Sequence, residues 1–440
     1  MRPAPASRSD QPVNDTINLI SGEFWGRDPH AELRWIRDNA PVYWDPHGEV
    51  WGISTYATVK DVSRHPGLFC NGQGIRPDNG PLPMMIDMDD PEHKLRRRLV
   101  SAGFTPRRVA GRRAYLERLC DEIIDRVCER GECDFVADLA AQLPLIVIGD
   151  ALGFAARDRQ TLLAWSDDML RALTGGDDPA LLSRAAEAFA GFNDYASAVV
   201  ADRRACPRDD LISALTHATV DGRRLDHESL LQESLLILIG GDETTRHVIS
   251  GGMWQLFRHP EQRRALAEDP SGIPAAVEEM LRWVSPIKNM ARTATRDTVL
   301  DGRAIAGGRH PPAAVSVRQP GPRGVHRSRR LRQHPAPERA PGLRQWPALL
   351  PGQQPGPSRN AGHVRQAPGP PARSGAGRFR RARPPARQLR LRLRIHARPL
   401  HTDPPRALVT SNRYRQGPRA RTQFHCYRRF AVVFVRRNVR

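Results

Sequence analysis

A run of five aliphatic residues near the middle of the chain, Leu235-Leu236-Ile237-Leu238-Ile239, is followed directly by Gly240-Gly241. A helix that is apolar on every face is surrounded by protein, and we expect this helix to extend from about His227 to Phe257. Two glycines weaken a helix by about 1 kcal/mol each relative to alanine, and they can open a kink or a widening. The pattern therefore predicts a buried helix with room for a small ligand beside its glycines.

Polar residues come directly after the glycines, where a buried helix normally avoids them. Asp242 is followed by Glu243 and by the hydroxyl residue Thr244. An acid and a hydroxyl beside a ligand space could handle protons. A second interpretation stays open here, in which one helix ends at the glycine pair and another begins with Asp242 as its N-cap.

The remaining pattern up to residue 308 is mostly helical, with short strands near both ends. We expect a β-hairpin over residues 42–53, a flexible loop over 71–83, helices through most of 111–204, and extended segments over 291–302. Shorter helices are predicted over residues 31–39, 56–64 and 273–284. The fold class predicted is mainly α with a small β region.

Charge divides the chain near Gly308. The formal net charge of the whole protein is +20, but residues 309–440 contain 31 arginines, no lysine and two acids, whereas residues 1–308 are mildly acidic. We therefore predict an N-terminal arm over residues 1–20, a globular body over 21–308 and an Arg/Pro-rich tail over 309–440. The tail is expected to be disordered, because its apolar content cannot offset the entropy lost on ordering.

The six cysteines form no CxxC pair and show no zinc spacing. The N-terminus lacks the apolar core of a signal peptide, and we find no apolar run long enough to cross a membrane. The sequence thus predicts a reduced, cytoplasmic protein with no membrane span and no metal-ligating cluster.

Three further sets of residues are candidates for chemistry. His93 and Arg97 are four residues apart, so they share a helix face and could grip an acidic ligand group. Glu279 and Arg282 form an i,i+3 pair, and Arg292 lies in an extended segment. The basic helical run with His93 and Arg97, and the pair of Glu279 and Arg282, are each more often ordinary surface features than sites.

In this order and at these spacings, the features of residues 20–308 resemble a soluble bacterial cytochrome P450. The family's Glu-x-x-Arg motif is matched by Glu279 and Arg282, and Arg292 falls where the family places another partner of the heme propionates. The surrounding sequence resembles mycobacterial monooxygenases that oxidise a sterol side chain. The other matches are Gly-Gly-x-acid-Thr at Gly240, Gly241, Glu243 and Thr244, and His-x-x-x-Arg at His93 and Arg97, with Phe104-Thr105-Pro106 after it.

The resemblance implies heme b as cofactor and hydroxylation of a hydrophobic substrate, such as a steroid or lipid side chain, with O2. Electrons would come from NAD(P)H through a ferredoxin and a ferredoxin reductase. Thr244 would hydrogen-bond the oxygen and Glu243 would relay protons, while Glu279 and Arg282 would be structural. The propionates would pair with His93, Arg97 and Arg292, and the iron would face Gly240 and Gly241.

The cysteine thiolate that the family uses as its iron ligand is missing. Its motif, Phe-Gly-x-Gly-x-His-x-Cys-x-Gly, does not occur, and Cys426 lacks the flanking glycines. When the codons implied by residues 343–352 are read one base later, they permit Phe-Gly-Asn-Gly-x-His-Phe-Cys-Leu-Gly. The same shift over residues 318–332 permits Ala-Asn-Arg-Asp, which resembles the family's sequence upstream of the cysteine. We therefore hypothesise a frameshift between about Gly308 and Arg318 that leaves the chain inactive as written.

A different class of function is also possible for the tail. Its arginines would attract phosphate, so it could bind nucleic acid or an anionic surface beside a non-catalytic helical domain. The tail has no repeats and few aromatic residues for base stacking. We therefore do not expect nucleic acid as a partner.

Overall fold

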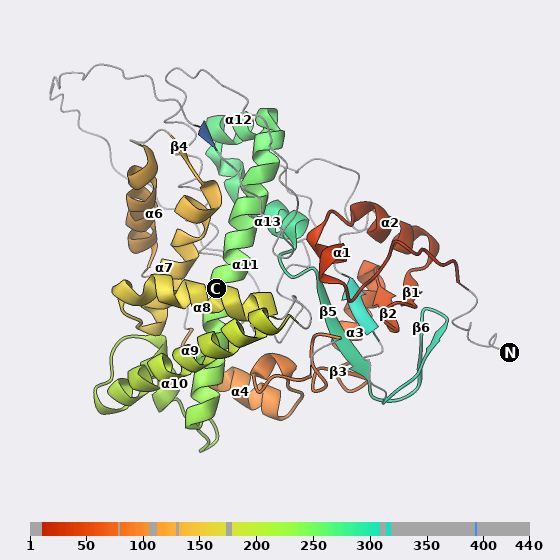
Figure 1. Cartoon of the computed structure of the whole chain (residues 1–440), viewed down its shortest axis with the longest axis horizontal. Helices are drawn as coiled ribbons and strands as arrows, with labels where there is room; N and C mark the ends of the chain where they lie inside the picture. Colours follow the sequence, from red (N-terminus) through yellow and green to blue (C-terminus); the bar gives the residue numbers. More distant parts are fainter. Residues whose placement is uncertain are drawn as a thin grey trace, which may run out of the picture.

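The computed structural model of the chain describes residues 11–77, 80–104, 112–128, 132–172, 178–308, 314–317 and 392–393. Helices make up most of this part, and most of the strands lie together at one side (Figure 1). The predicted class, mainly α with a small β region, is therefore confirmed. The described helices are α1 Gly22–Gly26, α2 His30–Asn39, α3 Tyr56–Arg64, α4 Glu92–Ser101, α6 Arg113–Cys128, α7 Gln142–Leu152, α8 Arg159–Ala172, α9 Pro179–Ala205, α10 Leu211–His217, α11 His227–Arg258, α12 Pro260–Glu268 and α13 Ile273–Val284.

Helix α11 is the central element, with 32 residues that continue through the glycine pair. Its N-cap is Asp226, whose side chain accepts a hydrogen bond from the Ser229 amide at 2.7 Å. The interpretation in which a new helix begins at Asp242 is therefore wrong. The reason is that packing on both sides of α11 outweighs the weak helix propensity of two glycines.

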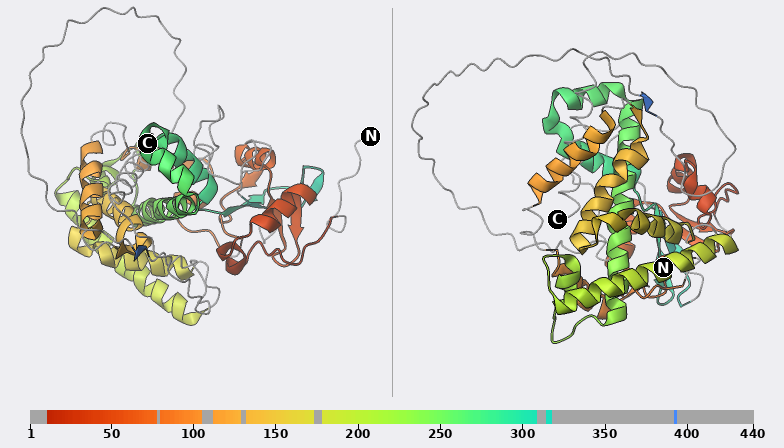
Figure 2. Two further views of the ribbon diagram at one scale, coloured as in Figure 1. Left: turned by 90° about the horizontal axis from the view of Figure 1, so that it is seen from above. Right: turned by 60° about the vertical axis from the view of Figure 1, so that its left-hand side comes forward.

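Helix α11 contributes residues to both of the main hydrophobic cores, and other helices lie on more than one side of it (Figure 2). Leu235 and Leu238 belong to a core that also contains parts of α8, α9 and α10. Val248 and Met253, farther along the same helix, belong to a core with α6, α7 and α13. Side chains in the middle of α11 are thus held from both ends by packed residues.

The larger sheet contains five strands in the order β1-β2-β8-β5-β3. Strand β8 pairs in parallel with β2 and antiparallel with β5, so it lies inside the sheet rather than at its edge. Smaller pairs are β6 with β7, and β4 with β9. The strands are β1 Val42–Asp45, β2 Val50–Ile53, β3 Phe69–Cys70, β4 Glu132–Cys133, β5 Asn289–Ala294, β6 Thr298–Leu300, β7 Arg303–Ile305, β8 Ala314–Val317 and β9 Arg392–Leu393.

The position of β8 bears on the boundary predicted at Gly308. Ala314–Val317 is a short run of small and β-branched residues, which suits an interior strand. The sheet therefore extends at least to Val317, beyond the point at which the composition changes. The prediction that the tail is disordered concerns residues 309–440. Apart from 314–317 and 392–393, these residues lie outside the described part of the chain.

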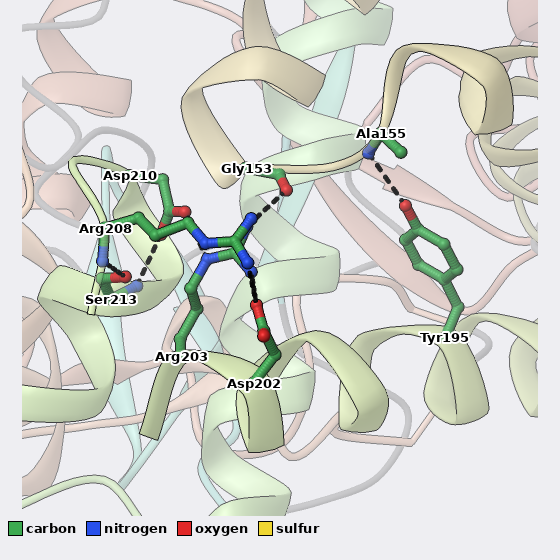
Figure 3. A network of polar contacts seen from close by, with 8 residues as sticks. All are labelled: Gly153, Ala155, Tyr195, Asp202, Arg203, Arg208, Asp210 and Ser213. Carbon is green, nitrogen blue, oxygen red and sulfur yellow. Dashed lines mark hydrogen bonds and ion pairs between the residues drawn. The ribbon is translucent and has the colours of Figure 1, made fainter. Parts of the chain in front are cut away.

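Arg203 joins the ends of three helices in one buried cluster (Figure 3). Its guanidinium forms ion pairs with Asp202 and, at 2.6 Å, with Asp210, and it donates to the Gly153 carbonyl at 2.8 Å. Nearby, the Tyr195 hydroxyl accepts the Ala155 amide at 3.0 Å. These contacts fix the turn after α7 against α9 and α10.

One helical stretch, Phe135–Leu152, is long and apolar enough to cross a membrane by length and composition. It consists of a π-helical segment, Phe135–Ala140, followed by α7. The sequence was expected to contain no run of about 18 apolar residues, and this stretch is indeed interrupted by Asp138, Gln142 and Asp150. Most of the stretch, 61%, is buried inside the protein, which is typical of a core helix.

Candidate functional site

One face of α11 is only half buried although the helix crosses both cores. This face contains residues spaced three or four apart, which line up on a helix. The glycine pair lies in its middle. The half-buried residues of this stretch are Leu236, Ile239, Gly240, Gly241, Thr244 and His247.

The two glycines have different surroundings. A methyl group added at Gly240 would meet no atom within 4 Å, so this glycine borders open space. A methyl group at Gly241 would lie 2.8 Å from Ile148 Cγ1, so here the missing side chain lets α7 approach. The predicted room for a ligand is therefore found beside Gly240, whereas Gly241 serves helix packing.

Thr244 lies one turn after Gly240 on this face. Its hydroxyl donates a hydrogen bond to the Gly240 carbonyl at 2.7 Å. This contact fixes the hydroxyl beside the open space, and the oxygen can still accept a hydrogen bond.

Glu243 is buried and belongs to a chain of charged groups. Its carboxylate forms an ion pair with Arg246 and lies 3.1 Å from His247 Nε2. Arg246 in turn lies 3.0 Å from a carboxylate oxygen of Asp167 on α8. The acid that the sequence singled out is thus held by the Arg246 guanidinium and by the His247 imidazole.

Asp242 is a functional candidate that sequence reasoning considered only as a helix cap. It is fully buried, and neither carboxylate oxygen has a hydrogen-bond partner in the described part of the chain. Burial raises the pKa of Asp242 to about 7, against the opposing charge of Arg246. The sequence signal that could have identified Asp242 as a candidate is the presence of an acid in the middle of an apolar helix.

Helix α4 presents a buried imidazole. His93 Nδ1 lies 3.4 Å from an oxygen of Asp90, and its buried Nε2 has no hydrogen-bond partner among the described residues. Burial lowers the pKa of His93, and it also lowers the pKa of Arg97 one turn later. Both groups are therefore removed from water on the same helix face.

Arg292 on β5 is a second buried cation near this helix. Burial lowers the pKa of Arg292 to about 10, while the charges of Asp89 and Asp87 oppose this shift. Asp89 also acts on His93 electrostatically, so the start of α4 and strand β5 share the influence of one carboxylate. His93 and Arg292 are about 200 residues apart in the sequence, and the fold places both within the electrostatic influence of Asp89.

The pair of Glu279 and Arg282 on α13 has two hydrogen bonds, of 2.6 and 2.5 Å. The side chains are only 9% and 12% exposed, respectively. A minor surface contact, which was the alternative interpretation, is therefore wrong for this pair. A buried, two-pronged ion pair fixes both side chains.

Sequence reasoning also missed Glu233, which lies two turns before Gly240 on α11. It is fully buried, accepts the Met85 amide at 2.8 Å and lies 3.2 Å from Arg96 Nη1. Burial raises the pKa of Glu233 to about 7. The carboxylate ties the short 3-10 helix Met85–Asp87 and α4 to α11, and no local sequence signal indicates these distant partners.

The donor set fits the periphery of an anionic cofactor such as heme. The His93 nitrogen without a partner, the buried Arg292 guanidinium and the half-buried Arg97 guanidinium suit two carboxylates, and the open space at Gly240 suits a flat, apolar ring. The iron ligand is a different matter. In the described residues no group of three or more His, Cys, Asp or Glu side chains could hold a metal ion, and Cys426, residues 343–352, Thr105 and Pro106 lie outside them.

Known proteins similar to this chain were found by sequence and by structure. No family model matches the chain. It is 52% identical over 293 residues to the steroid C26-monooxygenase of Mycobacterium tuberculosis, covering 66% of this chain and 73% of the relative. It is 35% identical over 323 residues to the methyl-branched lipid omega-hydroxylase of Mycobacterium bovis, covering 68% and 74%.

A solved structure of similar fold is a Mycobacterium marinum cytochrome P450 in complex with pseudoionone, with a TM-score of 0.66 and 30% identity over 74% of this chain and 85% of that one. A second is a Bacillus megaterium cytochrome P450 in complex with testosterone, with a TM-score of 0.59 and 28% identity over 66% and 76%. The relatives, the fold and the donor set agree, and the chain belongs to the cytochrome P450 family, whose cofactor is heme.

Proposed function

We propose that the body of this chain is the scaffold of a heme-dependent monooxygenase that hydroxylates a hydrophobic substrate of the steroid or branched-lipid class. The observation that carries the proposal is the half-buried face of α11, where Gly240 borders open space and Thr244 is fixed beside it. The printed functions of the two mycobacterial relatives support the substrate class. A cytoplasmic location, with electrons passing from NAD(P)H through a ferredoxin and its reductase, completes the proposal.

Two buried groups and one half-buried group would hold the heme. His93 on α4, Arg97 one turn later and Arg292 on β5 would pair with its two carboxylates, which would compensate the burial of these groups. When bound, heme supplies the iron at which O2 is activated. The residues of the chain orient the cofactor and exclude water from it.

Two residues on α11 would handle protons beside the heme. The Thr244 hydroxyl donates to the Gly240 carbonyl, so a proton sits at a defined atom next to the open space. Glu243 is the neighbouring titratable group and would exchange protons with that region. Glu279 and Arg282 would instead stabilise α13, because removing one partner of a buried pair leaves an unpaired charge.

The chain as written would lack the cysteine thiolate that ligates the iron. The thiolate donates electron density to the iron and favours cleavage of the O–O bond. The motif that supplies it is absent from the sequence, whereas a reading shifted by one base permits it over residues 343–352. We therefore propose that this polypeptide binds heme weakly or not at all and has no monooxygenase activity.

The test compares the chain as written with a chain translated after one base is removed between codons 308 and 318, so that the downstream codons are read one base later. Both would be purified with added heme, reduced and exposed to carbon monoxide. The restored chain should show the spectrum of a thiolate-ligated heme, and the chain as written should not. A thiolate-type spectrum from the chain as written would refute the proposed inactivity.

The substrate class can be tested on the restored chain. Steroids with an intact side chain and methyl-branched fatty acids would be titrated while the heme spectrum is recorded, with a short polar alcohol as control. Saturable spectral shifts are expected with one or both apolar classes. No shift with either class would contradict the proposed substrates and leave the heme assignment standing.

A further inference from the structure

His247 lies on the half-buried face of α11, one turn after Glu243. Its Nε2 atom is 3.1 Å from the Glu243 carboxylate oxygen Oε2, which is hydrogen-bond distance. The His247 side chain is 32% exposed, whereas the Glu243 side chain is 8% exposed. His247 thus connects a buried acid with a more open part of the molecule.

The other partner of Glu243 cannot carry protons. Arg246 forms an ion pair with Glu243 and contacts Asp167, which is 25% exposed. A guanidinium group stays protonated in proteins, so it can hold a carboxylate in place but cannot pass a proton onward. Of the two partners that Glu243 has in the described part of the chain, only His247 can both give and accept a proton.

The charges around His247 favour its neutral form. Burial lowers the pKa of His247 to about 4, and the positive charges of Arg246 and Lys288 act in the same direction. Asp167 on α8 acts in the opposite direction. Burial lowers the pKa of Lys288 itself, and the charge of Asp28 opposes that shift. A neutral imidazole has one nitrogen that donates and one that accepts, which is the form that a proton relay needs.

We infer that His247 is the positioning residue through which Glu243 exchanges protons with solvent. In one transfer to the Glu243 carboxylate, His247 Nε2–H gives its proton to Oε2, while Nδ1 takes a proton from a hydronium ion of the solvent, which becomes water. The ring is neutral before and after, in the other tautomer, and no electrons are transferred. The inference rests on the proposed role of Glu243, but it concerns a proton path that can be measured without heme.

The experiment measures how fast the Glu243 carboxyl group exchanges its proton. Glutamate would be labelled with 13C at the carboxyl carbon in the full chain, and the Glu243 line would be assigned with Glu243→Gln. Through its titration, the parent chain should give one averaged line, because exchange through His247 is fast. In His247→Gln the line should broaden or split, with exchange slower by at least a factor of about 100.

The glutamine variant separates a relay from a merely structural contact. Its side-chain amide can still donate a hydrogen bond to Glu243, but it cannot pass a proton. His259→Gln is the matched control, because His259 caps the end of the same helix, where its Nδ1 lies 2.9 Å from the Gln255 carbonyl. The control should leave the Glu243 line unchanged, and an averaged line in His247→Gln would overturn the inference.

A second measurement covers the case in which His247→Gln does not fold. The ring nitrogens of His247 would be labelled with 15N and compared in the parent chain and in Glu243→Gln. The proton is expected on Nε2 in the parent, and the variant should shift this tautomer balance. A proton on Nδ1 in both proteins would overturn the inference. Failure of the restored chain to show a thiolate-type spectrum with carbon monoxide would instead count against the proposed function alone.

Discussion

Asp242 offers the sharpest test of the energetics of α11. In an unfolded chain its carboxyl group is in water, where the usual pKa is 3.8, whereas burial raises the folded value to about 7. The folded state therefore prefers the protonated acid. The stability that this preference gives is fully present below pH 4 and is lost as the pH rises to about 7.

The substitution Asp242→Asn removes this titration and keeps the shape. Three pKa units correspond to about 4 kcal/mol, so the variant should gain up to about 4 kcal/mol relative to the parent between pH 4 and pH 8. The buried amide itself lacks partners and costs about 1–3 kcal/mol, but that cost is the same at every pH. The test is therefore how the difference in the free energy of unfolding between Asp242→Asn and the parent changes with pH, and not its sign at any one pH.

The assay is urea denaturation followed by tryptophan fluorescence at several pH values from 5 to 8. The difference in the free energy of unfolding between Asp242→Asn and the parent should increase by about 3 kcal/mol over this range. Asp194→Asn is the matched control, because Asp194 is exposed on α9 and stays in water in both states. If the Asp242→Asn and parent curves run parallel with pH, the carboxyl group is not titrating in a buried environment and the reasoning fails.

Two other substitutions test packing and pairing. Arg203→Ala should lower the free energy of unfolding by about 3–5 kcal/mol, because it leaves Asp210 buried without its partner; urea denaturation measures this. In thermal melts, Gly241→Ala should destabilise by about 1–3 kcal/mol because the new methyl group meets Ile148. Gly240→Ala should instead stabilise the protein by up to about 1 kcal/mol, since its methyl group meets nothing and alanine is the better helix former. Equal effects at the two glycines would contradict the asymmetry seen in the structure.

Element boundaries could be predicted from the sequence wherever the signal was local. Helix α3 was expected over residues 56–64 and α13 over residues 273–284, and the structure has both ranges. Threonine at the N-cap of α3 and proline in the first turn of α13 are signals that act within one turn of the chain. The hairpin of β1 and β2 was found for the same reason, since its turn is formed by consecutive residues.

Contacts between distant segments could not be predicted in the same way. The carboxylate of Glu233 accepts the amide of Met85 across 148 positions, and nothing near Glu233 in the sequence indicates that partner. The glycine pair shows the limit most clearly. The sequence predicted room for a ligand at both positions, but only the fold shows that Gly240 borders open space and that Ile148 approaches Gly241.

A change of reading frame affects the sheet and the iron ligand differently. Strand β8, Ala314–Val317, lies within the interval of residues 308–318 where the frame is proposed to change, and it is held by backbone hydrogen bonds to β2 and β5. Backbone pairing accepts any short sequence of small or β-branched residues, so either frame can complete the sheet. An iron ligand requires one particular thiolate at one position, and no neighbouring residue can replace it. A frameshift in this interval would therefore leave the described helices and sheet largely intact and would remove the chemistry.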